Sequence, residues 1–225
     1  MTPRKDSAPG APEGGDRLFA FFERLKTMSS IQRFGTLPMI QGENVAAHSF
    51  NVAILALLTA DYEENPAINV EKVLRQALLH DFEETVLSDI PHPIKHRFQG
   101  GKLGKVLKDI VPDLVRNEIF KELPEPLRDR CTRAALMAKD GIEGRIVGAA
   151  DAMDILVTSL RELKMGNRYF HSIFDVGLQL LSQFEDLKFA KLFAESARGY
   201  RERDHHAEAQ PTFSDEFVDP VRGMM

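Results

Sequence analysis

Residues 73–84 read Val-Leu-Arg-Gln-Ala-Leu-Leu-His-Asp-Phe-Glu-Glu, so that an apolar helical run ends in one histidine and three carboxylates. With 3.6 residues per turn, His80 and Asp81 lie about 100° apart around a helix and can both reach one point. A buried polar or charged group needs a partner or a metal to offset its lost hydration. The stretch therefore predicts a helix that carries a metal or acid–base site, provided that other ligands come from elsewhere in the chain.

Helical periodicity extends over nearly all of the remaining sequence. Asp16, Asn44 and Asn69 each precede an apolar run and can cap a helix. The apolar stripe that follows Asp16 consists of Leu18, Phe19, Phe22 and Leu25. The run that follows Asn69 is expected to continue through Glu84 and Thr85.

Later helices are expected at about 102–108, 112–122, 126–137, 144–163 and 167–200. No segment alternates with a period of two over the length of a strand. The sequence therefore predicts an all-α protein.

Length and composition indicate one folded domain with two tails. The chain has 225 residues, 43% of them hydrophobic and 28% charged, which is ordinary for a soluble globular protein. Residues 1–15 are rich in Pro, Gly and Ala, and residues 203–225 are polar. We expect a single domain at 16–202 between a disordered N-terminal extension and a flexible C-terminal tail.

Charge and cysteine content exclude several classes. The formal net charge of -5 gives no overall attraction for nucleic acid or an anionic membrane. The single cysteine, Cys131, excludes an intramolecular disulfide and a cysteine-rich zinc site, and we interpret it as a small buried hydrophobe. There is no signal-peptide pattern, and no run approaches about 18 apolar residues, so a cytoplasmic location is expected.

Two more polar residues interrupt apolar helix faces. His48 stands in the apolar stripe of the run after Asn44, and Asp151 lies between Val147 and Ile155 on one face. With His80 and Asp81 they supply two imidazole nitrogens and two carboxylates from three helices. That donor set suits one divalent cation (Co, Mn, Zn, Fe or Mg) and leaves positions for water and substrate.

The order and spacing of these residues resemble those of the HD-domain metal-dependent phosphohydrolases. His80 follows His48 by 32 residues, and Asp151 follows Asp81 by 70. Five short sequence segments are similar to those of bacterial 5′-deoxynucleotidases of the YfbR type. They are Ile31-Gln32-Arg33-Phe34, Glu43-Asn44-Val45-Ala46-Ala47-His48-Ser49, Leu79-His80-Asp81-Phe82-Glu83-Glu84, Ser88-Asp89-Ile90-Pro91-His92-Pro93-Ile94-Lys95 and Ala150-Asp151-Ala152. The resemblance covers about residues 18–193 and implies an HD-domain helical bundle.

The resemblance implies a role for each matching residue. The metal ligands would be His48, His80, Asp81 and Asp151. Glu84 matches the acidic residue that handles the attacking water, and Asp89 matches one near the sugar and leaving group. Arg33 matches the arginine that holds the phosphate, for which the guanidinium fork is well shaped.

One position departs from the pattern of the family. The YfbR-type enzyme of enteric bacteria has Trp where this chain has Phe34. If that aromatic ring helps to exclude ribonucleotides, the smaller ring of Phe34 would weaken discrimination against a 2′-hydroxyl. Lys95 begins a basic cluster that ends at Lys108. We interpret Lys95 as attracting substrate phosphate, whereas the rest of the cluster is equally well explained as a solvated surface segment. His92 and His96 lie on a proline-broken loop, so one metal is expected rather than two.

These matches predict hydrolysis of (deoxy)nucleoside 5′-monophosphates to nucleoside and inorganic phosphate. Two alternatives remain: a dNTP triphosphohydrolase, which needs more cationic residues around its pocket, and a non-catalytic regulatory HD module that binds nucleotide or metal. Relatives of this branch form homodimers, so the resemblance also implies a dimer.

Overall fold

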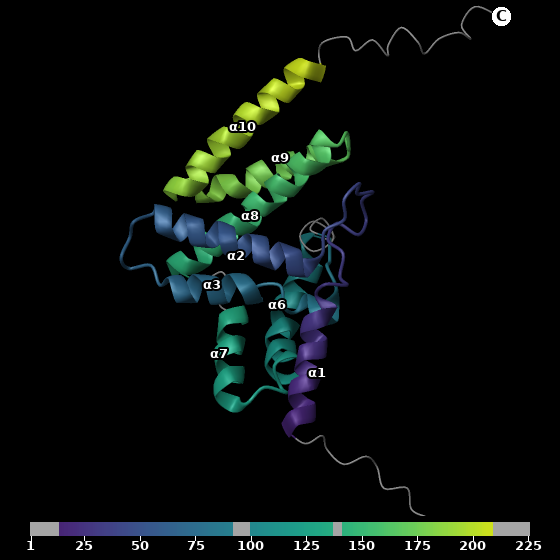
Figure 1. Cartoon of the computed structure of the whole chain (residues 1–225), viewed down its shortest axis with the longest axis vertical. Helices are drawn as coiled ribbons and strands as arrows, with labels where there is room; N and C mark the ends of the chain where they lie inside the picture. Colours follow the sequence, from purple (N-terminus) through teal and green to yellow (C-terminus); the bar gives the residue numbers. More distant parts are fainter. Residues whose placement is uncertain (1–13, 92–99, 137–140, 209–225) are drawn as a thin grey trace, which may run out of the picture.

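The computed structural model describes residues 14–91, 100–136 and 141–208 (Figure 1). The elements are α1 (Gly14–Thr27), α2 (Val45–Tyr62), α3 (Val70–Leu79), α4 (Glu84–Leu87), α6 (Lys102–Leu114), the π-helical turn η2 (Val115–Ile119), α7 (Glu125–Leu136), α8 (Gly141–Lys164), α9 (Phe170–Leu181), the 3-10 turn η3 (Ser182–Phe184) and α10 (Lys188–Glu208). Within the described ranges, the only β pairing is an isolated bridge between Gln32 and Asn44. The prediction of an all-α protein is confirmed.

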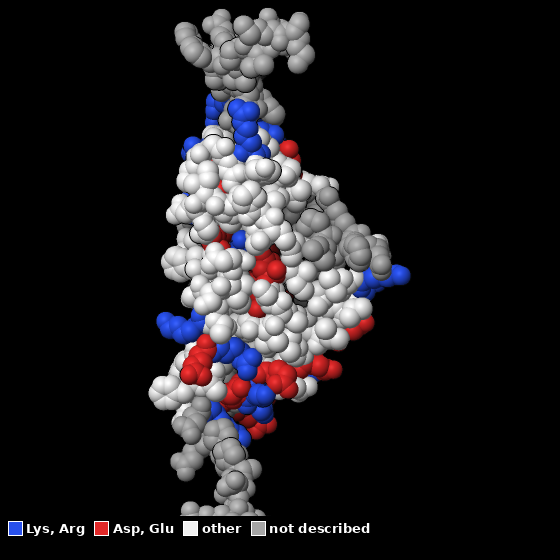
Figure 2. Space-filling model, turned by 90° about the vertical axis from the view of Figure 1, so that its right-hand side faces the viewer, with Lys and Arg blue, Asp and Glu red and all other residues white. Residues whose placement is uncertain are grey.

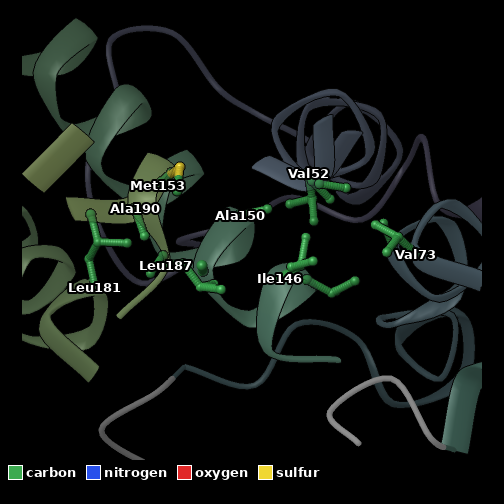
Figure 3. Packing of buried hydrophobic residues seen from close by; sticks show 14 of the residues in the cluster. Val52, Val73, Ile146, Ala150, Met153, Leu181, Leu187 and Ala190 are labelled. Atoms are coloured by element: carbon green, nitrogen blue, oxygen red, sulfur yellow. The ribbon is translucent and has the colours of Figure 1, made fainter. Parts of the chain in front are cut away.

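The main core forms around α8, which packs against α2 and α3 on one side and α9 and α10 on the other (Figure 1). Figure 3 shows Val52 of α2, Val73 of α3 and Ile146 of α8 pointing toward one another. All three side chains are fully or almost fully buried. This packing fixes α2, α3 and α8, the three helices on which the sequence places the metal ligands.

A second core lies below α3, between α1, α6, η2 and α7. Its most buried members include Phe82 and Phe120, whose ring centroids are 5.3 Å apart. Phe21 of α1 stacks on Phe82 at 5.9 Å. Because Phe82 follows His80-Asp81 directly, this core anchors the turn that carries two of the candidate ligands.

The helix containing the opening stretch is shorter than the sequence predicts. α3 ends at Leu79, and His80 is its C-cap. Tight turns follow, in which the N–H of Phe82 donates to the Leu79 carbonyl and the N–H of Glu84 donates to the Asp81 carbonyl. The expectation of one helix through Glu84 and Thr85 is wrong, because Phe82 turns into the second core instead of continuing around α3.

The apolar stripe expected on the first helix is not a core face. Leu18, Phe19, Phe22 and Leu25 are all exposed, and Phe19 is 71% exposed. Phe21 is instead the residue of this helix that packs against the second core. The periodicity predicts the helix correctly but the wrong face, since nothing local specifies where the rest of the chain will lie.

The last predicted helix, 167–200, is divided in two. α9 ends at Leu181, and a turn closed by the bond from the Leu187 N–H to the Phe184 carbonyl leads into α10. The reversal allows both Leu181 and Leu187 to be buried in the same core. α10 continues to Glu208, past the expected boundary at residue 202.

Two helices expected at 102–108 and 112–122 are instead continuous, since α6 runs through Pro112 and leads directly into η2. α7 and α8 agree with the prediction to within three residues.

Among the described residues, one helix, α2, is long and apolar enough to cross a membrane by length and composition alone, and 44% of that span is buried inside the protein. Its composition reflects the face that it buries against α3 and α8.

Candidate metal and phosphate site

The four predicted ligands meet where α2, α3 and α8 come together. His48 Nε2 lies 3.3 Å from His80 Nε2, 3.2 Å from Asp81 Oδ2 and 3.4 Å from Asp151 Oδ1. His80 Nε2 is 3.2 Å from the same Asp81 oxygen. The imidazoles are buried, whereas the Asp81 and Asp151 side chains are 25% and 36% exposed. The two carboxylates therefore form the open side of the cluster.

These separations fit a bound cation. Ligand atoms about 2.0–2.2 Å from one ion are separated from one another by roughly 3–3.5 Å at tetrahedral or octahedral angles. Donor atoms of His48, His80 and Asp151 all lie within 4.8 Å of one another. Asp81 is outside that mutually close trio but adjoins both imidazoles. Small adjustments of its carboxylate would complete a four-ligand site.

The hydrogen bonds of the imidazoles set which nitrogens face the site. His80 Nδ1 is 2.8 Å from the Ala77 carbonyl, which can only accept, so Nδ1 carries the proton. His48 Nδ1 is 2.7 Å from Asp154 Oδ2 and donates to it in the same way. In the neutral rings both Nε2 atoms then present lone pairs toward Asp81 and Asp151. Four acceptors facing one point require a cation or extra protons between them.

The electrostatics show the same requirement. Burial lowers the pKa of His80, but Asp81, Asp151 and the Ala77 carbonyl together outweigh burial and raise that pKa to about 9. Burial opposes ionisation of Asp81, yet His80 and His48 hold its pKa well below the ordinary value. Burial, followed by the charges of Asp81 and Asp89, raises the pKa of Glu84 to about 9. Without a metal the cluster retains protons, and a divalent cation would displace them.

Arg33 lies beside this cluster, in the loop before α2. Its N–H donates to the Glu43 carbonyl at 2.9 Å, next to the bridge between Gln32 and Asn44. Its Nη1 donates to Glu43 Oε2 at 2.9 Å and to Asp154 Oδ2 at 3.1 Å. Burial lowers the pKa of Arg33, but Asp151, Asp154 and further carboxylates raise it overall, so the guanidinium stays charged.

Phe34 and Asp89 complete this side of the site. The Phe34 N–H donates to Asp89 Oδ2 at 3.1 Å. The Phe34 ring packs edge-on against Phe170 at 5.5 Å, and its centroid is 5.0 Å from the guanidinium carbon of Arg33. The structure thus brings Arg33, Phe34 and Asp89 together from segments 55 residues apart.

A pocket of about 490 Å³ opens below His80, Asp81 and Glu84. Its opposite wall comes from α6, η2 and α7 and includes Lys105 and Lys108. Figure 2 shows acidic side chains in a hollow of a largely uncharged face, with a small area of Lys or Arg beside them. Lys95, His92 and His96 lie outside the described residues.

Three functional candidates were missed in the sequence: Glu43, Asp154 and Thr158, all buried. Asp154 follows Asp151 by three residues and Thr158 follows Asp154 by four, so helical periodicity places them along one face of α8. Glu43 begins the segment Glu43-Asn44-Val45-Ala46-Ala47-His48. Only the fold shows that Glu43 and Asp154 both accept hydrogen bonds from Arg33, that Asp154 also contacts His48, and that Thr158 donates to Glu43.

Comparison with known proteins places the chain in a family. The family described as 5′-deoxynucleotidase YfbR-like matches residues 20–198. The chain belongs to this family. A 5′-deoxynucleotidase of Vibrio cholerae serotype O1 is 32% identical over 184 residues, which cover 78% of this chain and 93% of the relative. A 5′-deoxynucleotidase of Enterobacter sp. is 30% identical over 156 residues, covering 67% and 76%.

Solved structures agree on the fold. An HD-domain phosphohydrolase from Listeria innocua matches with a TM-score of 0.68 at 24% identity, over 79% of this chain and 86% of the other. A cyanophage S-2L HD phosphohydrolase, bound to dA and one catalytic Zn2+ ion, matches with a TM-score of 0.53 at 19% identity, over 79% and 96%. These findings confirm the predictions of an HD-domain fold and of a metal-dependent nucleotide phosphohydrolase.

Proposed function

We propose that this protein removes the 5′-phosphate from (deoxy)nucleoside monophosphates, giving nucleoside and inorganic phosphate. The observation that carries the proposal is the position of the Arg33 guanidinium, whose side chain is only 11% exposed, beside four convergent candidate metal ligands. Asp154 Oδ2 adjoins both Arg33 Nη1 and the ring of His48. Relatives named 5′-deoxynucleotidase support the substrate class.

In this proposal each cluster has a separate task. His48, His80, Asp81 and Asp151 would hold one divalent ion, which when bound lowers the pKa of water and offsets charge on the phosphate. Arg33 would bind the phosphate. Within the described part of the chain, both hydrogen bonds from its side chain leave from Nη1. Nη2 and Nε therefore remain available for two phosphate oxygens.

Glu84 and Asp89 would handle protons and the sugar. A water oxygen attacks phosphorus, the bond from phosphorus to the 5′-oxygen breaks, and the leaving oxygen gains a proton. Glu84, at the start of α4 and lining the pocket, would orient the water and accept its proton. Asp89 would bind the sugar or protonate the 5′-oxygen, since its carboxylate is held next to Phe34.

A dNTP triphosphohydrolase is the second candidate. Lys105 and Lys108 line the pocket, and cationic side chains there suit a longer phosphate chain. The products distinguish the two reactions, because a monophosphatase releases orthophosphate and a triphosphohydrolase releases tripolyphosphate or pyrophosphate. We rank a regulatory HD module lower because Glu84, a water-activating acid, is retained.

We also propose that the protein is cytoplasmic, has no membrane or nucleic-acid partner, attracts substrate phosphate through Lys95 and forms a homodimer. Phe50, Ile54 and Leu58 form an exposed apolar row on α2 that a second copy could cover, and sedimentation velocity tests this.

A substrate panel with a ligand variant tests the activity. Ribo- and deoxynucleoside mono- and triphosphates would be assayed with Mn, Co, Mg and Zn, scoring the released product. Asp81→Ala should lower metal-dependent turnover by at least about 100-fold, because one ligand and its charge are lost. The control is Asp61→Asn, at the exposed end of α2. Normal turnover by Asp81→Ala would refute the scheme.

A further inference from the structure

One carboxylate links the candidate metal ligands to the guanidinium of Arg33. Asp154, on α8, is 1% exposed, and its Oδ2 accepts hydrogen bonds from His48 Nδ1 at 2.7 Å and from Arg33 Nη1 at 3.1 Å. Its Oδ1 is buried and has no hydrogen-bond partner among the described residues. The negative charge of Asp154 is therefore offset through a single oxygen by two groups with different expected tasks.

A second carboxylate contacts only one of those groups. Glu43, also buried, accepts from Arg33 Nη1 at 2.9 Å and from Thr158 Oγ1 at 3.1 Å, both at Oε2. Its Oε1 is 3.4 Å from Asn51 Nδ2. None of these contacts involves His48. The two carboxylates thus share the guanidinium but differ in their relation to the metal cluster.

We propose that Asp154 is a positioning residue that couples metal binding to phosphate binding, and that Glu43 positions Arg33 alone. The phosphate half of this inference rests on the proposed function of Arg33, whereas the metal half does not. A carboxylate that accepts from the far nitrogen of a ligating imidazole fixes its tautomer and orientation and makes it a better ligand. The same Asp154 oxygen keeps the Arg33 fork aimed beside that ligand.

The coupling predicts different behaviour in two variants. Asp154→Asn should weaken Co²⁺ binding by about 10–100-fold, measured calorimetrically on the metal-free protein, and change the Co²⁺ absorption spectrum. It should also weaken inorganic phosphate binding at saturating metal and raise KM. Glu43→Gln should weaken phosphate binding and raise KM, while its Co²⁺ affinity stays within about twofold of wild type. Asp61→Asn serves as the control and should change neither affinity.

The inference is overturned if Asp154→Asn binds Co²⁺ as wild type does, or if Glu43→Gln loses metal affinity to the same extent. Circular dichroism establishes that each variant is folded. If Asp154→Asn is insoluble, Asp154→Glu is tested in its place, because it moves the carboxylate by one methylene. Suppose that the wild type has no nucleotidase activity but that Asp154→Asn still binds Co²⁺ more weakly than Glu43→Gln does. The proposed function would then be refuted, whereas the role of Asp154 in metal binding would stand. Weakened metal binding with unchanged phosphate binding in Asp154→Asn would refute the coupling itself.

Discussion

Phe34 has a backbone φ of 55°, in the left-handed region that aromatic residues rarely adopt. Such a conformation costs on the order of 1–3 kcal/mol and persists only where the surroundings hold it. Here Asp89 accepts from its N–H, and Phe170 and Arg33 pack on its ring. This backbone conformation holds the ring beside Arg33, the proposed phosphate ligand, and we propose that the ring faces the sugar of a bound nucleotide.

Ring size at position 34 should therefore affect sugar selection. We expect Phe34→Trp to raise the ratio of kcat/KM for deoxyribonucleotide over ribonucleotide by roughly 3–10-fold, because a larger wall leaves less room for a 2′-hydroxyl. The measurement is kcat/KM for dAMP and AMP with both proteins. An unchanged ratio would show that Phe34 does not contact the sugar.

Glu162 stabilises the loop that carries this region. It is fully buried, and its two oxygens accept from the backbone N–H groups of Ile40 and Gln41 at 2.8 and 2.9 Å. Burial alone would raise its pKa, but the N–H groups of Ile40, Asn167 and Gln41 outweigh burial and lower it below the ordinary 4.5. Ionised Glu162 therefore contributes stability that is present above pH 4.5 and is lost as the pH falls through its lowered folded-state pKa.

We expect Glu162→Gln to lower the free energy of unfolding by about 1–3 kcal/mol at neutral pH, because an amide cannot accept at both positions. The difference from wild type should shrink at acidic pH, where Glu162 itself becomes protonated. Urea denaturation at pH values on either side of the transition provides the measurement. Glu195→Gln, at an exposed position of α10, is the control. A difference independent of pH would contradict the proposed charge dependence.

At the level of elements, α8 determines both the core and the site. One face carries Asp151, Asp154 and Thr158, and the remainder packs against α2, α3, α9 and α10. Its contact with α9 is unusually close at Gly177, where an added Cβ would lie 2.9 Å from Leu156 Cδ2 and 3.2 Å from Ile155 Cγ2. Leu156 is itself buried, so it has little room to move.

Gly177→Ala should consequently destabilise the protein. A helical Ala gains up to about 1 kcal/mol over Gly, whereas overpacking a buried contact costs about 1–3 kcal/mol. We expect the steric cost to prevail and the Tm to fall by several degrees, as measured by differential scanning calorimetry. Gly15→Ala, in α1, has no atom within 4 Å of the added Cβ and serves as the control. A Tm equal to or above wild type would show that α9 can shift away from α8.

At the scale of the whole molecule, two hydrophobic cores meet at the cluster of candidate metal ligands. The main core positions His48 and Asp151, and the second core anchors the turn after His80 through Phe82. The pocket beneath the cluster is closed on its far side by α6 and α7, so its charge depends on packing between distant segments. Lys105 and Lys108 add positive charge there, opposite Glu83 and Glu84.

We expect the double variant Lys105→Ala, Lys108→Ala to weaken inhibition by a deoxynucleoside triphosphate by roughly 3–10-fold while changing monophosphate kcat/KM much less. Exposed lysines act mainly through long-range attraction, so the effect should fade at high salt. The measurement is the inhibition constant at low and high ionic strength. Lys191→Ala, on the exposed face of α10, is the control. A larger loss for the monophosphate would place its phosphate near α6 instead of Arg33.

Local pattern predicted the helical class and most of the helices, although not all of their ends, and it singled out the candidate ligands. The caps at Asn44 and Asn69 accept from the N–H groups of Ala47 and Lys72, as expected, because capping involves only neighbours in sequence. His48 and Asp151 stood out because polar side chains interrupted apolar faces. Resemblance to a family then supplied the roles proposed for Arg33, Glu84 and Asp89.

What the sequence by itself determined was the all-helical fold and the candidate set of metal ligands, since both depend on short-range periodicity and side-chain chemistry. Only the tertiary structure decided that α3 ends at Leu79, that the stripe of α1 is exposed and that α9 and α10 are separate helices. It alone showed Asp154 between His48 and Arg33, a contact across 121 residues. Such features depend on which surfaces meet, and burial over long sequence distances outweighs local helix preference.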